Sequence, residues 1–168
     1  MTIERQAAMA TLEEGHASVR ALVARLTTVE LERSATIGGG DWSARDLVGH
    51  LTAWEEHALA ALEAWGAGRG APIQRALREQ GLNAVNAATA AADRRRATGE
   101  VLRRSDAIHA GLIEALRAIP DATWLEPPTQ RSRQPLGEVV GSILGGPAGP
   151  FSHAAAHLPE LERYVLGR

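Results

Sequence analysis

The chain has no cysteine, its 18 basic residues are all arginine, and only 4% of its 168 residues are aromatic. The absence of cysteine excludes disulfides, thiolate metal sites and cysteine nucleophiles, which leaves histidine and carboxylate as the available metal ligands. Because aromatics are scarce, the core must consist of alanine, leucine, valine and isoleucine, a composition that favours packed helices over sheets. The arginine-for-lysine usage indicates nucleotide bias in the source genome and carries no functional meaning.

Strong charge and long apolar runs are also missing. The formal net charge is −2, so there is no global electrostatic case for binding nucleic acid or an anionic membrane. No apolar run approaches the roughly 20 residues that span a bilayer, and residues 1–15 contain early acidic residues and no apolar signal core. We therefore expect a cytoplasmic protein that forms a single domain over residues 1–168.

Apolar residues recur at helical spacing through most of the chain, and no segment alternates as a strand does. Four principal helical segments are predicted, the third interrupted near Gly81 and the last interrupted or kinked by GGPAGP: about 2–31, 43–65, 74–119 and 136–167. Long connections are expected around 66–80 and 120–135. The prediction is an all-α fold, a four-helix bundle.

Three histidines form a pattern typical of a metal site. His153 and His157 are four residues apart in the last helical segment, so both imidazoles lie on one side of that helix. His50 lies in the segment 43–65 and can supply a third ligand if the two helices pack together. On helical wheels all three flank the apolar stripe, where bundle proteins place metal ligands from facing helices. Three protein ligands leave one coordination position open, as in catalytic zinc sites.

The other histidines and nearby polar residues have weaker signals. His57 shares the side of the helix that carries His50, so it is an alternative or additional ligand. Glu160 and Tyr164 continue the side that carries His153 and His157, and could orient an imidazole or a water. His16 and His109 have no partner pattern, and we assign them no role.

A cluster of arginines marks the third helical segment: Arg94, Arg95, Arg96, Arg103 and Arg104. A solvated helical face is its first interpretation, because no aromatic residues are interleaved with the arginines as they are in nucleic-acid-binding surfaces. Binding the carboxylate of a small anionic substrate is the alternative.

Two motifs resemble those of a known family. The segment 42–54 reads Trp-Ser-x-x-Asp-Leu-x-x-His-Leu-x-x-Trp, and the segment 153–161 reads His-x-x-x-His-Leu-x-Glu-Leu. Together with Asn83 and Asn86, their order resembles the DinB-like four-helix bundle superfamily, which includes mycothiol-dependent maleylpyruvate isomerases and ClbS/DfsB-type proteins. The resemblance covers essentially the whole chain.

The resemblance implies a metal triad at His50, His153 and His157, which is the set that the helical wheels select. It also implies zinc or nickel as the ion and, for some members, a homodimer. Some members use a low-molecular-weight thiol in transfer or isomerisation, whereas others act as metal-dependent hydrolases. The Gly-Pro cluster before His153 is richer than the family pattern, which bears on the geometry of the histidine pair.

Two functions therefore stay open at the level of the sequence. The first is a metal-dependent enzyme that acts on a small-molecule substrate by thiol transfer, isomerisation or hydrolysis. The second is a non-catalytic helical protein that binds a ligand or partner without a functional metal. A homodimer is expected from three tryptophans near helix ends or loops, where large aromatics often meet a partner: Trp42, Trp65 and Trp124.

Overall fold

The computed structural model describes residues 3–38, 40–126 and 134–167, and in this part of the chain helices are joined by turns and loops, without a β-strand. The all-α class predicted from the composition is confirmed. The helices of the described residues are α1 (Arg5–Val23), α2 (Thr28–Glu32), α3 (Ala44–Gly66), α4 (Pro72–Gln80), α5 (Leu82–Asp93), α6 (Thr98–Ala118), α7 (Asp121–Leu125), α8 (Leu136–Ile143) and α9 (His153–Leu166).

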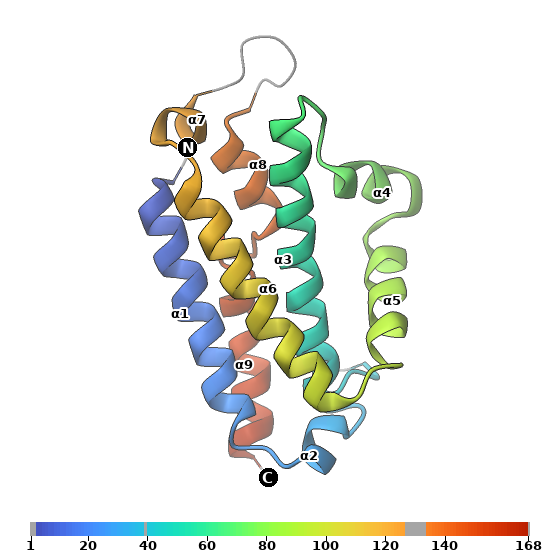
Figure 1. Cartoon of the computed structure of the whole chain (residues 1–168). Helices are drawn as coiled ribbons and strands as arrows, with labels where there is room; N and C mark the ends of the chain where they lie inside the picture. The colour runs from blue at the N-terminus through green and yellow to red at the C-terminus, as the bar shows by residue number, and fades with distance from the viewer. Residues whose placement is uncertain (1–2, 39, 127–133, 168) are drawn as a thin grey trace.

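Helix α3 is the centre of the arrangement. It packs against α6 over much of its length and also contacts α2, α4, α5, α8 and α9. Helix α1 lies beside α6 and α9, while α4 and α5 cover the outer flank of α3 (Figure 1). Where α1 crosses α9, Gly15 leaves so little room that a Cβ atom there would lie 3.0 Å from Cβ of Ala154. Because α3 contacts several helices, side chains on different sides of α3 meet different neighbours.

The start of α3 is fixed by the capping box that the sequence predicts at Ser43 and Asp46. The Ser43 hydroxyl accepts from the Asp46 amide at 3.1 Å, and the Asp46 carboxylate accepts from the Ser43 amide at 3.0 Å. Both side chains are buried. This cap determines where the helix begins, and so sets the direction in which His50 points.

The first predicted helix, 2–31, is divided in the structure. Helix α1 ends at Val23, and α2 begins at Thr28 after a second capping box, formed by Thr27 and Glu30. The Thr-x-x-Glu signal was present in the sequence, and continuous apolar spacing concealed it.

The expected connection around 66–80 is wrong in its second half. Helix α4 begins at Pro72, a residue whose fixed φ suits the first turn of a helix. The predicted interruption at Gly81 is confirmed, since Gly81 has φ of 80° between α4 and α5. The third segment is broken a second time, between α5 and α6.

The connection predicted at 120–135 contains the short helix α7, and its residues 127–133 lie outside the described part. Trp124 on α7 is fully buried, and its indole N–H donates to the Ile3 carbonyl at 2.8 Å. Its side chain therefore has no surface to offer a partner subunit, which removes one of the three tryptophans behind the homodimer prediction.

The Gly-Pro cluster separates α8 from α9, as the sequence predicts. Phe151, with φ of 63°, and Gly149, with φ of 120°, reverse the chain. The His153 amide then donates to the Leu144 carbonyl at 3.0 Å, which ties the start of α9 to the end of α8. A Cβ atom on Gly146 would lie 3.0 Å from the Ser152 carbonyl, so this close turn requires glycine.

None of the helices in the described ranges combines the length and apolar composition that a membrane span requires.

Candidate metal centre

The three histidines of the predicted triad come together in the structure. His50 lies in the second turn of α3, and His153 and His157 lie in the first two turns of α9. Each offers a ring nitrogen, and these nitrogens all lie within 4.8 Å of one another. The prediction that the segment containing His50 lies beside the last helix is thereby confirmed.

The rings are arranged around a common point. Their centroids are 4.9 Å apart for His50 and His153, 5.4 Å for His50 and His157, and 5.2 Å for His153 and His157. Nε2 of His50 lies 3.0 Å from Nε2 of His153. Two nitrogens on a tetrahedral zinc ion would lie roughly 3.4 Å apart, given bonds of about 2.1 Å. This spacing is therefore close to what one shared ion demands.

Burial keeps the imidazoles of His50 and His153 neutral. Desolvation, together with the neighbouring rings of His153 and His157, lowers the pKa of His50 to about 3. Desolvation and His157 lower the pKa of His153 to about 4. Both rings therefore retain a free lone pair at neutral pH, the state in which imidazole coordinates a metal.

The cluster forms one wall of a cavity of about 490 Å³. Two tryptophans, Trp42 and Trp54, stand beside the histidines, and residues of α4, α5 and α8 complete the walls. Polar groups come from Gln74, Asn86 and Ser142, and none of the described residues lining the cavity is aspartate, glutamate or arginine. The sequence singled out Asn86 only through the family resemblance, and gave no signal for Gln74 or Ser142, which approach only in the folded chain.

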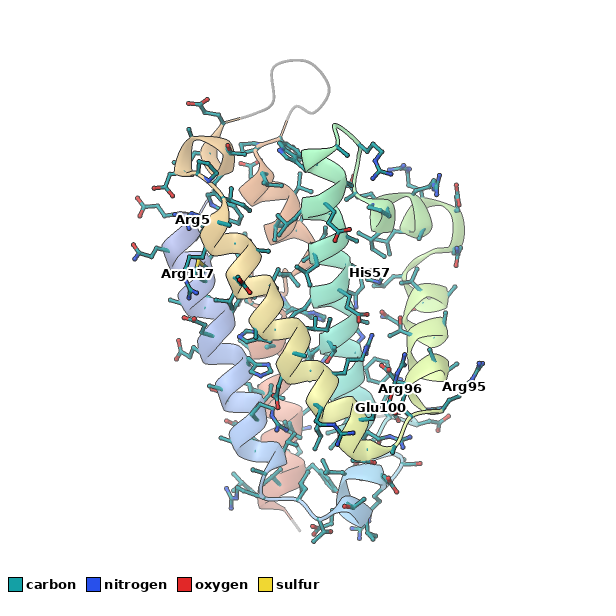
Figure 2. The ribbon with its side chains drawn as sticks, in the orientation of Figure 1. Arg5, His57, Arg95, Arg96, Glu100 and Arg117 are labelled. Atoms are coloured by element: carbon teal, nitrogen blue, oxygen red, sulfur yellow. The ribbon has the colours of Figure 1, made fainter. Side chains whose placement is uncertain are left out.

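His57 is not part of the triad. It lies on the flank of α3 that faces α4 and α5, where it lines a separate cavity of about 290 Å³ (Figure 2). Its ring contacts Trp54 with centroids 5.6 Å apart. Seven residues after His50, it is about 20° away around the helix and two turns further along, which is too far along the axis for a shared ion.

Of the two residues expected to support the histidines, one lies next to the triad and the other contacts a different helix. A Glu160 carboxylate oxygen lies 3.7 Å from Nδ1 of His157, within ion-pair reach. The Tyr164 hydroxyl instead donates to the Glu30 carbonyl at 2.8 Å, so it joins α9 to α2. Glu160 therefore lies beside His157 at a distance longer than a hydrogen bond, whereas the Tyr164 hydroxyl is engaged with another helix.

Most of the arginine cluster is engaged within the protein. Arg96 and Arg104 pair with the buried Asp93 at 2.6 and 3.2 Å, and Arg94 lies 3.4 Å from Asp46. Arg96 also approaches Glu100 at the start of α6, whereas Arg95 points outward (Figure 2). These ion pairs join α3, α5 and α6. They also neutralise two buried carboxylates, those of Asp46 and Asp93.

Two histidines without a sequence pattern also meet. His16 of α1 and His109 of α6 stack with ring centroids 4.0 Å apart and planes 3° from parallel, next to Glu55 of α3. Their three helices are far apart in sequence, so no spacing rule could have found the group.

Comparison with known proteins gives one result. The curated proteins yield no match, and neither do the solved structures. A family model described as the DinB superfamily matches residues 11–145, which include His50 and end just before α9. The match extends over most of the chain and agrees with its helical architecture, and the chain therefore belongs to the DinB superfamily.

Proposed function

We propose that His50, His153 and His157 bind one divalent ion, zinc or nickel, and that the protein is a metal-dependent enzyme acting on a small molecule in the adjoining cavity. The observation that carries the proposal is the convergence of three imidazoles within 4.8 Å at the wall of a cavity of about 490 Å³. A ligand set that leaves one position facing such a cavity is the arrangement of catalytic sites.

The residues present fit such an ion. Imidazole suits zinc and nickel, and the lowered pKa values of His50 and His153 mean that little proton release opposes binding near neutral pH. Nδ1 of His50 is buried and has no hydrogen-bond partner among the described residues. A buried polar atom of this kind is a cost to the fold and is characteristic of functional sites.

When bound, the ion would supply Lewis acidity and lower the pKa of a water or thiol at its open position. The protein contributes the rest. His50, His153 and His157 would hold the ion, Glu160 lies beside His157, and Trp42 and Trp54 wall the cavity next to the histidines. Because the chain has no cysteine, a thiol nucleophile would have to arrive as a low-molecular-weight cofactor.

The cavity wall favours a neutral substrate. Two indole rings and the aliphatic side chains of Ile73, Leu77 and Ile143 offer apolar contact, and Gln74, Asn86 and Ser142 offer hydrogen bonds. No arginine lines the described wall to hold a carboxylate. We infer an aromatic or aliphatic substrate with amide, carbonyl or hydroxyl groups, and we do not expect a dianionic one.

The helices can be grouped into a bundle. We infer a four-helix bundle within one domain, in which α1, α3, α6 and the consecutive α8 and α9 form the four columns. Helices α4 and α5 then act as an insertion that walls the cavity (Figure 1). A homodimer and a cytoplasmic location stay predictions.

One observation favours the alternative, a ligand-binding protein without metal. The 3.0 Å contact between His50 and His153 is a hydrogen bond in its own right if one ring donates and the other accepts. A neutral, apolar cavity beside such a pair would bind a ligand without catalysis.

Removing the chelating pair separates these functions. The double variant His153→Ala/His157→Ala should lose one equivalent of zinc or nickel and all turnover, because two of three ligands are gone. His57→Ala, on the same helix as His50 but outside the triad, should keep both. Calorimetric titration of tag-free apo protein measures the binding. Equal metal binding by wild type and the double variant would contradict the proposal.

A further inference from the structure

A second group of metal-ligating side chains lies on the other side of α3. His16 from α1, Glu55 from α3 and His109 from α6 place one ligand atom each within 4.8 Å of the others. Nδ1 of His109 lies 2.9 Å from a Glu55 carboxylate oxygen. Because Glu55 follows His50 by five residues, it points about 140° away around the helix. The group is therefore separate from the triad.

A nearby cation would stabilise the buried negative charge of Glu55. Its side chain is only 13% exposed, and its ion-pair partner in the described part of the chain is His109, a residue that is charged only when protonated. Arg20, which shares Asp106 with His16, pairs with that aspartate at 2.8 Å. A carboxylate this buried is costly unless a positive charge lies next to it. Either a protonated His109 or a bound ion can supply that charge.

The space beside the group has the size of one ion or water. A cavity of about 20 Å³ adjoins His16 and Glu55 but not His109. Thr52 and Ser105 are its other polar lining residues, and the rest of its wall is apolar: Val19, Val48, Leu51 and Ala154. About 10–15 Å³ of such space holds one water molecule. The cavity is therefore large enough for a single ion but too small for an organic substrate.

His16 is held in the manner of a metal ligand. Nε2 of His16 lies 3.2 Å from an Asp106 carboxylate oxygen, so this nitrogen donates outward and leaves Nδ1 free. Histidine ligands commonly donate their second ring N–H to a carboxylate in this way. Burial and the neighbouring His109 lower the pKa of His16, which keeps its lone pair available. The rings of His16 and His109 are stacked with planes 3° from parallel, so binding one ion requires at least one ring to turn about its second side-chain torsion.

We propose that His16, Glu55 and His109 form a second divalent-metal site, specific for a zinc-like ion, that joins α1, α3 and α6. Two imidazoles and one carboxylate are an established ligand set for zinc. The proposal does not depend on the metal function of the triad.

The stoichiometry of zinc binding tests the second site. Tag-free apo protein, titrated with zinc by calorimetry and weighed by native mass spectrometry, should bind two ions per chain. His153→Ala/His157→Ala should bind one, Glu55→Gln should bind one, and the combination should bind none. In each variant the affected site should weaken by at least about 100-fold, since a direct ligand is lost and not merely a supporting group.

The matched control is Glu63→Gln, which removes an exposed carboxylate from the same helix and should leave two ions bound. If Glu55→Gln binds two ions with unchanged affinity, or if His153→Ala/His157→Ala binds none, the second site does not exist. If wild type binds one ion and Glu55→Gln none, the second site stands and the triad does not bind metal. The two proposals therefore fail in distinguishable ways.

A second variant covers the case in which Glu55→Gln does not fold. The His16 side chain is 19% exposed and lies near the rim of the group, so His16→Ala should preserve the helical circular dichroism. It should lose the same single ion. A folded His16→Ala protein that retains two ions at wild-type affinity would overturn the proposal.

Discussion

The two sides of α3 carry similar ligands in different surroundings. On one side, three histidines border a cavity of about 490 Å³ lined by two indole rings. On the other, two histidines and a glutamate form the group, and His16 and Glu55 of this group border a cavity of about 20 Å³ between α1, α3, α6 and α9. Catalytic sites keep a position that a substrate can reach, and structural sites do not. Access, more than ligand type, therefore distinguishes the roles proposed for the two sides.

The packing of the surrounding helices causes this difference. On the triad side, α9 begins only at His153, and α4 and α5 pack on the flank of α3 and wall the large cavity (Figure 1). On the opposite side, α6 packs along α3, and α1 packs against α6 and α9, so His109 and His16 approach Glu55 from these two helices. A helix that is covered on one side and partly open on another can combine a rigid site with an accessible one.

Gly49→Ala tests whether a change in the packing of α3 leaves the metal sites on its two sides intact. It has the largest expected effect. A Cβ atom there would lie 2.4 Å from Oδ2 of Asp93, a side chain held by Arg96 and Arg104. We expect unfolding to become easier by about 1–3 kcal/mol, as for other overpacked sites. Urea denaturation measures the loss, and zinc stoichiometry should not change.

The matched control for Gly49 is Gly111→Ala in α6, where an added Cβ atom meets nothing within 4 Å. This change should stabilise the helix by about 0.5–1 kcal/mol. If both variants were equally stable, the contact of Gly49 with Asp93 would not constrain α3.

Asp106→Asn sharpens the comparison by affecting the enclosed side alone. It replaces the carboxylate next to Nε2 of His16 with a neutral amide. Zinc affinity at the second site should therefore fall about 10-fold, the lower end of the range of about 10- to 100-fold for groups that support a metal ligand. Affinity at the triad should stay unchanged. Competition with a chromophoric chelator measures both sites, and an equal loss at the two would show that they are coupled.

The pH dependence of stability addresses the triad side, with the smallest expected effect. Because the pKa of His153 is lowered to about 4 by burial and His157, the unfolded chain binds more protons than the folded one below about pH 6.5. The free energy of unfolding of apo protein should therefore fall as the pH falls from about 6.5 to 5. His153→Gln should reduce this slope by up to about 1 kcal/mol per pH unit.

Urea denaturation in the presence of a chelator gives that slope. The comparison of wild type with His153→Gln removes the contribution of the carboxylates, which is common to both. An identical slope in the two proteins would mean that His153 is not buried as a neutral ring.

Local rules predicted what depends on neighbours along the chain. The Ser43–Asp46 capping box, the interruption at Gly81 and the spacing of His153 and His157 are all short-range signals, and each is confirmed. The Thr27–Glu30 box and Pro72 are equally local signals. Continuous apolar periodicity concealed the box, and the loop-like composition of the segment concealed the helix start at Pro72.

Features that depend on tertiary packing could not be predicted. His16, Glu55 and His109 come from three helices, and neither their spacing nor their neighbours indicate that they meet. The ion pairs of the arginine cluster could not be predicted for a related reason, since Asp93 and Glu56, which engage Arg104, approach it only when α3, α5 and α6 pack together. His50 was identified because the resemblance and the helical wheels both pointed to it.

The break between α8 and α9 has an electrostatic consequence. Because α9 begins at His153, the N-terminal end of this helix lies at the wall of the large cavity, which His153 and His157 line. Aligned peptide dipoles give this end of a helix a partial positive charge of about half a unit. An anion in the cavity beside His153, such as hydroxide or a thiolate, should gain about 0.3–1 kcal/mol from that field. A single uninterrupted helix from residue 136 to residue 167 would have no such positive end beside the histidines.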